Sequence, residues 1–377
     1  MSANLYFYPL GNADSSLIRL ENDQLILIDY ANMCDDGNTD DLRCNLPVEL
    51  RRILSETGKE DFDVVCFTHL DNDHVKRASD FFWFESLKET QKSGRPKIKE
   101  LWVPACAVTE VGCEEESRRV RQEARTRLLA GEGIKVFARP KMLEEFLTTH
   151  GLSVEERRHC IVNAGELVPG FSLENESKAE FFVHSPFAWR INNREVEDRN
   201  QDSVVLHVTL RTEHNDSRLI FGGDVDAETL SKIVLTSERH DRHDRLQWDL
   251  LHLFHHCSWK SLSTEKPVDA VSPQEDVQRL LEVYGGNNAI IVSPSKPIPH
   301  PGSKEDFDPQ PPHRLAANYY KELVLSKSGH FLVTMEYPNE LEPKPLCFEV
   351  SKYGITRKAA IAQSSTLTVA TTNQRAG

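Results

Sequence analysis

The sequence lacks the features of a membrane-spanning or secreted chain. It has no apolar run of the roughly 18 residues that a membrane-spanning helix needs. Its first residues lack a basic region followed by a long apolar stretch, which is the pattern of a secretory signal. The 8 cysteines are scattered, form no Cys-x-x-Cys pair and lie in several cases in apolar runs, as free buried thiols do. We therefore expect a chain without a disulfide framework in a reducing, cytoplasmic setting.

The chain has fewer positively charged than negatively charged side chains. The chain carries 45 Lys and Arg against 59 Asp and Glu, for a formal net charge of −14. An acidic protein repels phosphate polymers at long range, which argues against a protein that coats or packages nucleic acid. Enzymes that act on phosphates can still be acidic overall, because bound metal ions supply the local positive charge. The charge therefore leaves a metal-dependent phosphodiesterase open.

Short apolar runs and helical patterns occur in both halves of the chain, and no internal repeat of fixed period is present. This arrangement predicts two packed sheets flanked by helices. We expect a single domain over residues 1–355, with a charged, helical surface insertion near residues 110–170. Residues 356–377 are rich in Ala, Ser, Thr and Gln, which predicts a flexible C-terminal tail.

The segment 63–74 concentrates candidate metal ligands. A short apolar run, Val64 to Phe67, has the composition of a strand, and it is followed by ligand-type residues at four of the next seven positions. These residues are His69, Asp71, Asp73 and His74. Imidazole and carboxylate together suit zinc, manganese or iron. The alternative is a solvated loop in which Asp73 caps a helix that starts near Val75. The density of ligand-type residues favours a metal site.

Further apolar runs also end in a polar side chain. The residues at these ends are Asp29, His184, Asp224, and the pair His255 and His256. Each occurrence alone is weak evidence, because a Gly-Gly-Asp is usually a turn and a histidine at a strand end usually makes an ordinary hydrogen bond. Together with segment 69–74, they place carboxylates and imidazoles at the ends of separate strands. Such a set suits two metal ions about 3.5–4 Å apart that share a water nucleophile.

At this point the sequence resembles a known family. Residues 69–74 resemble the His-x-His-x-Asp-His loop of the metallo-β-lactamase superfamily, with Asp71 in place of the central histidine. Residues 221–224 and 255–260 resemble the Gly-Asp and His-His-Gly-Ser-Lys segments of its ComEC-type branch, which also carries aspartate at the position of Asp71. Residues 11–18, 26–29 and 200–206 resemble its opening hairpin and its Asn-x-x-Ser strand start. The resemblance spans about residues 4 to 350.

The resemblance implies an α/β (α+β) fold, a four-layer αββα sandwich with two divalent metal ions at one edge of its sheets. The ligands that it implies for the first metal ion are His69, Asp71 and His184. The ligands that it implies for the second are Asp73, His74 and one of His255 and His256. Asp224 would bridge the two ions. Because a carboxylate at Asp71 hardens the first site, manganese becomes as plausible as zinc.

The resemblance also implies a metal-dependent hydrolase, specifically a phosphodiesterase or nuclease. Asp73 would orient the attacking water or accept its proton. The groups that would hold the substrate's anionic oxygens are Lys260, Ser258 and Ser203. The proline-rich segment 294–312 is either a pocket wall, with Lys296 and His313 facing the site, or a plain surface connection. Cys257 stands where the branch has glycine, and Trp259 precedes Lys260 as an extra residue, so we expect the fine substrate contacts to differ.

The substrate class stays open between DNA, RNA and a small nucleotide, and the negative charge favours a short or small one. An alternative from another class is a hydrolase of carbon esters, lactones or thioesters on the same metal centre. A second alternative is a non-enzymatic interaction module, against which the intact ligand set argues. Members of the branch often work beside other proteins, so the resemblance also implies a protein partner from the same operon, although no residue identifies it. The sequence leaves the oligomeric state open.

Overall fold

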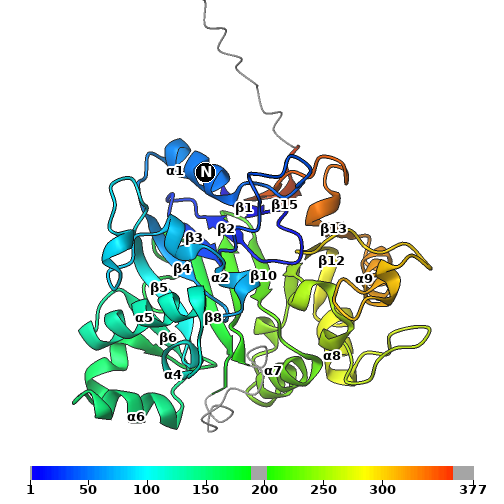
Figure 1. Cartoon of the computed structure of the whole chain (residues 1–377). Helices are drawn as coiled ribbons and strands as arrows, with labels where there is room; N and C mark the ends of the chain where they lie inside the picture. Colours follow the sequence, from blue (N-terminus) through cyan, green and yellow to red (C-terminus); the bar gives the residue numbers. More distant parts are fainter. Residues whose placement is uncertain (1, 188–201, 360–377) are drawn as a thin grey trace, which may run out of the picture.

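The strands gather into two sheets that pack face to face, with helices on both outer faces (Figure 1). The computed structural model describes residues 2–187 and 202–359. The first sheet has 9 strands in the order β15-β14-β1-β2-β3-β4-β5-β6-β7. Its strands are β1 (Ala3–Phe7), β2 (Ser16–Arg19), β3 (Leu25–Ile28), β4 (Phe62–Cys66), β5 (Ile98–Pro104), β6 (Ile134–Phe137), β7 (Ile161–Val162), β14 (Leu346–Ser351) and β15 (Gly354–Arg357).

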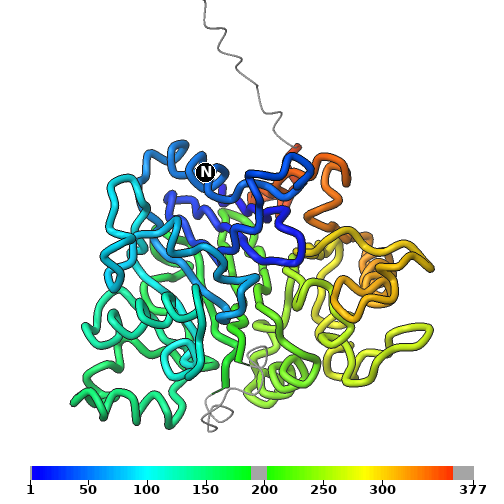
Figure 2. The backbone as a smooth tube through the Cα atoms, in the orientation of Figure 1, coloured from blue at the N-terminus to red at the C-terminus, as the bar shows by residue number. Residues whose placement is uncertain are grey.

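The second sheet has 6 strands in the order β13-β12-β11-β10-β9-β8. Its strands are β8 (Ala179–Ser185), β9 (Val205–Arg211), β10 (Asp216–Gly222), β11 (Trp248–His252), β12 (Gly285–Ser293) and β13 (His330–Val333). Figure 2 shows that the N-terminal segment and the last described strands lie side by side, as the antiparallel pairing of β1 with β14 requires.

Three apolar layers separate the sheets and helices. In β3, Leu25 and Leu27 face the helices on the first sheet, whereas Ile26 and Ile28 face the second sheet. A strand that is buried on both faces reads as a continuous apolar run, and this explains the sequence Leu-Ile-Leu-Ile. The third layer lies between the second sheet and its own helices. The order helix, sheet, sheet, helix is the four-layer αββα sandwich expected from the sequence, and that prediction is confirmed.

The helices divide between the two outer faces. Those whose apolar residues cover the first sheet are α1 (Leu46–Thr57), α3 (Ala78–Phe81), α4 (Cys106–Thr109), α5 (Glu115–Ala130) and α6 (Lys141–Thr149). Those that cover the second sheet are α7 (Ala227–Arg239), α8 (Glu275–Glu282) and α9 (Arg314–Ser326). In residues 2–187 and 202–359, no helix combines the length and apolar composition that crossing a lipid bilayer requires.

The region near 110–170 differs from the surface insertion expected from its charge. It contributes β6 and β7 to the first sheet, and α5 packs on that sheet through Val120, Ala124 and Leu128. Its buried charges are paired, since Arg127 Nε lies 2.7 Å from Glu123 Oε1. Charge pairs that satisfy each other can lie in the interior, so the charge run did not mark a solvated face.

The C-terminal boundary also shifts. β15 continues to Arg357, beyond the predicted domain end at residue 355. The predicted flexible tail lies outside the described residues from position 360 onward. Of the segment 200–206, which carries the Asn-x-x-Ser motif, the structure describes residues 202–206. Residues 200 and 201 lie outside the described part.

Both sheets direct strand ends to one edge of the sandwich. β3 and β4 run parallel in the first sheet, as do β10, β11 and β12 in the second. Parallel strands place their carboxyl ends at a common edge, and loops at such an edge are a usual place for ligands. The segments that carry Asp29, His69, Asp224 and His256 leave the sheets here.

Candidate metal centre

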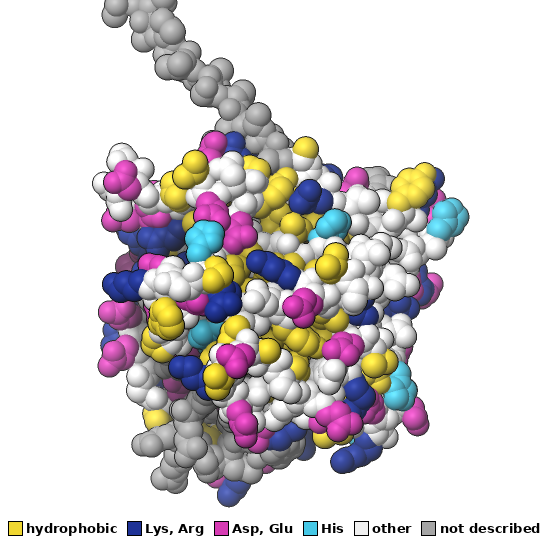
Figure 3. Space-filling view, turned by 90° about the vertical axis from the view of Figure 1, so that its right-hand side faces the viewer, with side chains coloured by type: hydrophobic (Ala, Val, Ile, Leu, Met, Phe, Trp, Pro, Cys, Tyr) yellow, Lys and Arg dark blue, Asp and Glu magenta, His cyan; other side chains and the backbone are white. Residues whose placement is uncertain are grey.

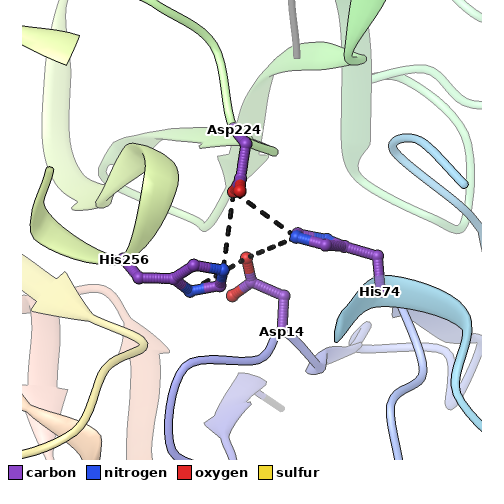
Figure 4. Close-up of side chains that lie close together, drawn as sticks. All are labelled: Asp14, His74, Asp224 and His256. Atoms are coloured by element: carbon purple, nitrogen blue, oxygen red, sulfur yellow. Dashed lines mark ion pairs between the residues drawn. The ribbon is translucent and has the colours of Figure 1, made fainter. Parts of the chain in front are cut away.

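Four buried side chains converge at this edge, as Figure 4 shows. Asp14 comes from the loop between β1 and β2, and His74 from the short helix α2 (Asn72–Val75) that follows β4. Asp224 follows β10, and His256 lies in the turn η6 (Phe254–Cys257) after β11. One nitrogen or oxygen atom of each lies within 4.8 Å of the corresponding atoms of the others. The fold thus brings two imidazoles and two carboxylates, remote in sequence, to one point.

The distances within this cluster leave room for a shared ion. Asp224 Oδ1 lies 3.4 Å from His74 Nε2 and 3.6 Å from His256 Nε2. Asp14 Oδ2 lies 3.7 Å from His74 Nε2. These separations exceed those of ordinary charged hydrogen bonds. They suit atoms that share a central cation rather than bond directly to one another.

A second group of ligand atoms adjoins the first and consists of His69, Asp73 and His74. Asp73 Oδ2 also lies 3.2 Å from His256 Nε2. His69 Nε2 lies 3.7 Å from Asp71 Oδ2, and the side chain of Asp71 is 36% exposed. The two groups share His74, so they form two adjacent candidate metal sites with one residue in common.

His255, the other histidine predicted at this edge, lies next to the four-residue cluster. Its Nε2 lies 3.8 Å from Asp224 Oδ2, and its side chain is 14% exposed, against 2% for His256. His256 is therefore the better-buried member of the pair, and it is the one that joins the four-residue cluster. Of the two histidines, His256 is therefore the candidate ligand at that cluster.

Hydrogen bonds on the far side of each ring orient three of the histidines. The Nδ1 atoms of His69, His74 and His256 lie 3.1 Å from Thr68 Oγ1, 2.8 Å from Asp29 Oδ2 and 2.8 Å from the Pro294 carbonyl oxygen, respectively. An Nδ1–H that donates outward leaves Nε2 free to bind a metal ion. In all three rings it is Nε2 that faces the cluster.

Asp29 and Thr68 form the support for His74. Thr68 donates from its backbone N–H to Asp29 Oδ1 and from its hydroxyl to Asp29 Oδ2, at 2.7 Å in each case. The same Asp29 oxygen accepts from His74. Such carboxylate–histidine pairs fix the ring orientation and raise the basicity of a metal ligand. The apolar run 25–28 therefore ends in a supporting carboxylate, a role that the sequence left unassigned.

Several of the buried polar atoms that face the cluster have no hydrogen-bond partner among the described residues. These atoms are His69 Nε2, His74 Nε2, Asp224 Oδ1 and both carboxylate oxygens of Asp14. An unsatisfied buried polar group costs roughly 1–3 kcal/mol, so several of them aimed at one point need a common partner. A divalent cation meets that need. The mixed nitrogen and oxygen donors fit zinc, manganese or iron.

Neighbouring charges shift the pKa values of Asp224 and His256 in opposite directions. Burial alone acts to raise the pKa of Asp224, but His256 and His74 outweigh it and hold that pKa well below its usual range. Burial alone acts to lower the pKa of His256, but Asp224 and Asp73 outweigh it and raise that pKa to about 10. Metal binding at these nitrogens therefore displaces protons, and metal affinity falls as the pH falls.

The turn that carries His255 and His256 adopts an unusual backbone. His255, His256 and Cys257 have φ values of 49°, 49° and 67°. Positive φ values are uncommon for residues other than glycine, so this turn is strained at three consecutive positions. The turn is held by hydrogen bonds from Ser258 N to the His255 carbonyl and from His313 N to the Cys257 carbonyl. Cys257 thus preserves the loop, and its buried side chain packs into the third apolar layer.

His184 lies outside the cluster, which corrects its assignment as a ligand. It shares a strand face with Phe182, opposite to the face by which Phe181 and Val183 enter the central layer. Its Nε2 lies 2.8 Å from the carbonyl oxygen of Arg245. Among the described residues, neither group of candidate ligand atoms includes His184. Burial lowers its pKa to about 4, so it is a neutral interior histidine.

The three residues predicted to hold the substrate's anionic oxygens differ in their exposure to solvent. Lys260 is exposed, three residues after the end of the turn. Ser258 is 1% exposed, and its hydroxyl accepts from the backbone N–H of Lys260 at 3.3 Å, which caps the short helix η7 (Trp259–Ser261). Ser203 is fully buried. Lys260 therefore remains the best placed of the three to meet a substrate.

The proline-rich segment 294–312 lies against the site. The Pro294 carbonyl holds His256, and Lys296 N donates to Asn12 Oδ1 at 3.0 Å, two residues before Asp14. The side chain of Lys296 is exposed. At the other end of the segment, His313 Nδ1 accepts from the backbone N–H of Trp259 at 3.4 Å. These contacts place the backbone of the segment beside the site.

Two buried residues of the site were missed in the sequence. Asp14 sits in a Gly-Asn-Ala-Asp segment that has the composition of a turn, which hides its role. His252 interrupts the apolar run of β11, and its Nε2 lies 3.1 Å from Asp14 Oδ1. Its ring packs against those of Phe7 and Phe221, with centroid distances of 5.7 and 5.8 Å. A polar residue inside an apolar strand was the available signal for His252.

Replacing Asp29 by asparagine is expected to lower metal affinity about 10–100-fold, the usual effect of losing such a support. The amide cannot accept the same set of hydrogen bonds from Thr68 and His74 as the carboxylate. Metal titration monitored by calorimetry measures the change, with exposed Asp40→Asn as the matched control. Unchanged affinity in Asp29→Asn would show that His74 needs no such support.

No protein-family model matches the sequence, and neither does any curated protein. Among solved structures, the chain is similar to the class B3 di-zinc metallo-beta-lactamase LRA-12 from an Alaskan soil metagenome, with 13% identity, a TM-score of 0.31, and coverage of 73% of this chain and 84% of that one. It is similar to a diphosphatase from the PhnP family, with 12% identity, a TM-score of 0.31, and coverage of 93% and 98%. It is also similar to unliganded yeast PDE1, with 11% identity, a TM-score of 0.41, and coverage of 88% and 98%. With TM-scores below 0.5, these likenesses do not bear on substrate or activity.

Proposed function

We propose that the chain is a metal-dependent hydrolase of the metallo-β-lactamase superfamily that cleaves phosphodiesters with two divalent ions, zinc or manganese. The observation that carries the proposal is the convergence of unpartnered, buried nitrogen and oxygen atoms at the edge of the two sheets. The order of motifs along the chain supports the finer assignment to the ComEC-type branch. Cations bound there would polarise a phosphoryl oxygen and lower the pKa of a water molecule near it.

The chain's own residues divide the remaining work. His69, His74 and His256 present preoriented nitrogens. Asp73 is 33% exposed at the edge of the cluster, so it can reach both the cluster and an incoming water, and it can take up the proton that the water loses. Lys260 lies exposed beside the turn, where its ammonium group can hold an anionic substrate oxygen.

The surface charge supports a small substrate rather than a polymer. On the face shown in Figure 3, Lys and Arg side chains are interspersed with Asp and Glu. The net charge of −14 adds long-range repulsion of a polyanion. A compact phosphodiester reaches the metal centre without needing a long basic track.

The test is turnover of bis(p-nitrophenyl) phosphate by metal-stripped protein that is resupplied with Mn²⁺ or Zn²⁺. We expect two bound ions per chain, by elemental analysis, and restored hydrolysis. Asp73→Asn should lose about 100-fold or more in rate, the usual range for a proton acceptor. Asp40→Asn, an exposed substitution of the same kind, should match the wild type.

Each contradicting outcome points to a different alternative. Full metal loading without phosphodiester turnover, but with hydrolysis of p-nitrophenyl acetate, would assign the centre to carbon esters. Absence of bound metal in correctly folded protein would refute the hydrolase and leave an interaction module.

A further inference from the structure

A pocket of about 210 Å³ lies beside the turn that carries His255 and His256. Trp259, Lys266, Phe307, His313 and Arg314 contribute to its lining, and we call it the Trp259 pocket. Its volume is below the roughly 300–1,000 Å³ of sites for drug-sized ligands. It has room for one ring system rather than for a string of residues.

The Trp259 pocket is connected to the turn that carries His255 and His256. Trp259 lies two residues after Cys257, the last residue of the turn. His313 donates its backbone N–H to the Cys257 carbonyl at 3.1 Å and accepts at Nδ1 from the backbone N–H of Trp259. The rings of Trp259 and His313 have centroids 6.2 Å apart. These contacts fix two wall residues of the pocket, Trp259 and His313, to the turn.

The lining combines an aromatic face with polar groups of both signs. Trp259 is partly exposed, and Lys266 is exposed at the rim. Arg314 Nε donates to Asp306 Oδ1 at 2.7 Å, which fixes the guanidinium in the wall. Asp308, also in the lining, offers a carboxylate acceptor. An aromatic face flanked by donors and an acceptor matches a nucleobase, which stacks through its ring and bonds through its edge.

The rim carries apolar side chains that lack cover in the described part of the chain. Phe307 is 78% exposed and Val268 is 87% exposed. Both line the pocket, so a ring seated on Trp259 would bury part of their surface. Lys260 follows Trp259 directly and is exposed.

We propose that the Trp259 pocket binds the base of a nucleotide substrate and that Lys260 guides the attached phosphate to the metal centre. The proposal rests on the phosphodiesterase function and narrows its substrate to base-bearing phosphates. Trp259, the extra residue before the lysine, is then the specificity determinant of the loop.

Binding equilibria test this without any turnover. AMP and ribose 5-phosphate carry the same phosphate and sugar, and only AMP carries a base. Calorimetric titration of the metal-loaded protein should give AMP an affinity about ten-fold or more above that of ribose 5-phosphate, the range expected from stacking on one aromatic ring. Trp259→Ala should reduce this ratio to near one, and Trp259→Phe should retain most of it. Tyr353→Ala, which removes an aromatic side chain that is 80% exposed on the β14–β15 turn, is the matched control.

Equal affinities for the two ligands in the wild-type protein would overturn the proposal, and this result requires no variant to fold. A preference for AMP that survives Trp259→Ala would overturn it as well. The outcome is separate from that of the proposed reaction. A base preference in a protein that fails to cleave bis(p-nitrophenyl) phosphate keeps the pocket and refutes the reaction, whereas cleavage without base preference does the reverse.

Discussion

Replacing Asp224 by asparagine is expected to abolish metal binding at the four-residue cluster and hydrolysis with it. Asp224 Oδ1 lies within 3.6 Å of both His74 Nε2 and His256 Nε2, and within residues 2–187 and 202–359 this oxygen has no hydrogen-bond partner. The asparagine side chain keeps the size but removes the negative charge that makes the cluster attractive to a divalent cation. Its amide N–H₂ can also point a donor at the imidazoles.

The expected losses of metal affinity and of turnover follow from the contribution that a direct metal ligand makes to each. Loss of a residue that only supports a ligand costs about 10–100-fold in metal affinity, and a direct ligand should cost more. Loss of one preorganised stabilising group lowers rates by roughly 10²–10³, so we expect turnover to fall about 1,000-fold or more. Elemental analysis after gel filtration and steady-state turnover measure the two quantities.

Thermal unfolding of the metal-stripped proteins separates this effect from misfolding. Asp40→Asn is the matched control, because Asp40 is exposed in the loop before α1. If folded Asp224→Asn retained two bound ions and near-normal turnover, Asp224 would have no place in the metal centre.

Several residues of the candidate metal centre were predicted because they lie in the loop that follows an apolar strand. This pattern is local: a strand in the core must end where the chain reaches the sheet edge, and a charged residue at that point lies in the edge loop. His69 and His74 after β4, Asp224 after β10 and His256 after β11 all follow it. Parallel pairing then brings their ends together, and the order of motifs indicated the fold that produces such pairing.

The pattern fails where the direction of a side chain, or a contact between segments remote in sequence, determines whether a residue reaches the cluster. At His184 the strand end was recognised, but the sequence did not show which face of β8 the side chain takes. Asp14 reaches the cluster because its backbone N–H bonds to the Asp73 carbonyl at 3.0 Å, a contact between segments that are remote in sequence. Since turns favour aspartate for local reasons, composition alone could not distinguish a buried ligand from a turn residue there.

Charge misled the interpretation of residues 110–170 for a related reason. Glu123 is fully buried, and besides pairing with Arg127 its carboxylate accepts from the backbone N–H groups of Glu85 and Ser86. A charged residue with this many partners can occupy the interior. The partners lie some 40 positions earlier in the chain, so no window of sequence around α5 contains them.

Replacing Gly223 by alanine is expected to disable the site although no ligand is changed. A Cβ at Gly223 would stand 2.6 Å from Thr68 Oγ1 and 2.9 Å from His69 Nδ1, both closer than real Cβ contacts allow. Gly223 cannot easily move away, because its backbone N–H bonds to the Val204 carbonyl at 3.3 Å. The clash therefore displaces Thr68 and His69.

Thr68 is the hydroxyl that connects Asp29 to the histidines, so its displacement disturbs His69 directly and His74 through Asp29. A misplacement of about 1 Å in a catalytic group can cost roughly 100-fold in rate, and we expect at least that loss of turnover in Gly223→Ala. Overpacking of this kind typically also costs about 1–3 kcal/mol of stability, which leaves most domains folded. Gly37→Ala is the control, since its Cβ would meet only Asp35 Oδ1, at 3.3 Å, within 4 Å. Wild-type metal affinity and turnover in Gly223→Ala would mean that the Asp29–Thr68 support yields to the added methyl group, and that the ligands hold their positions without it.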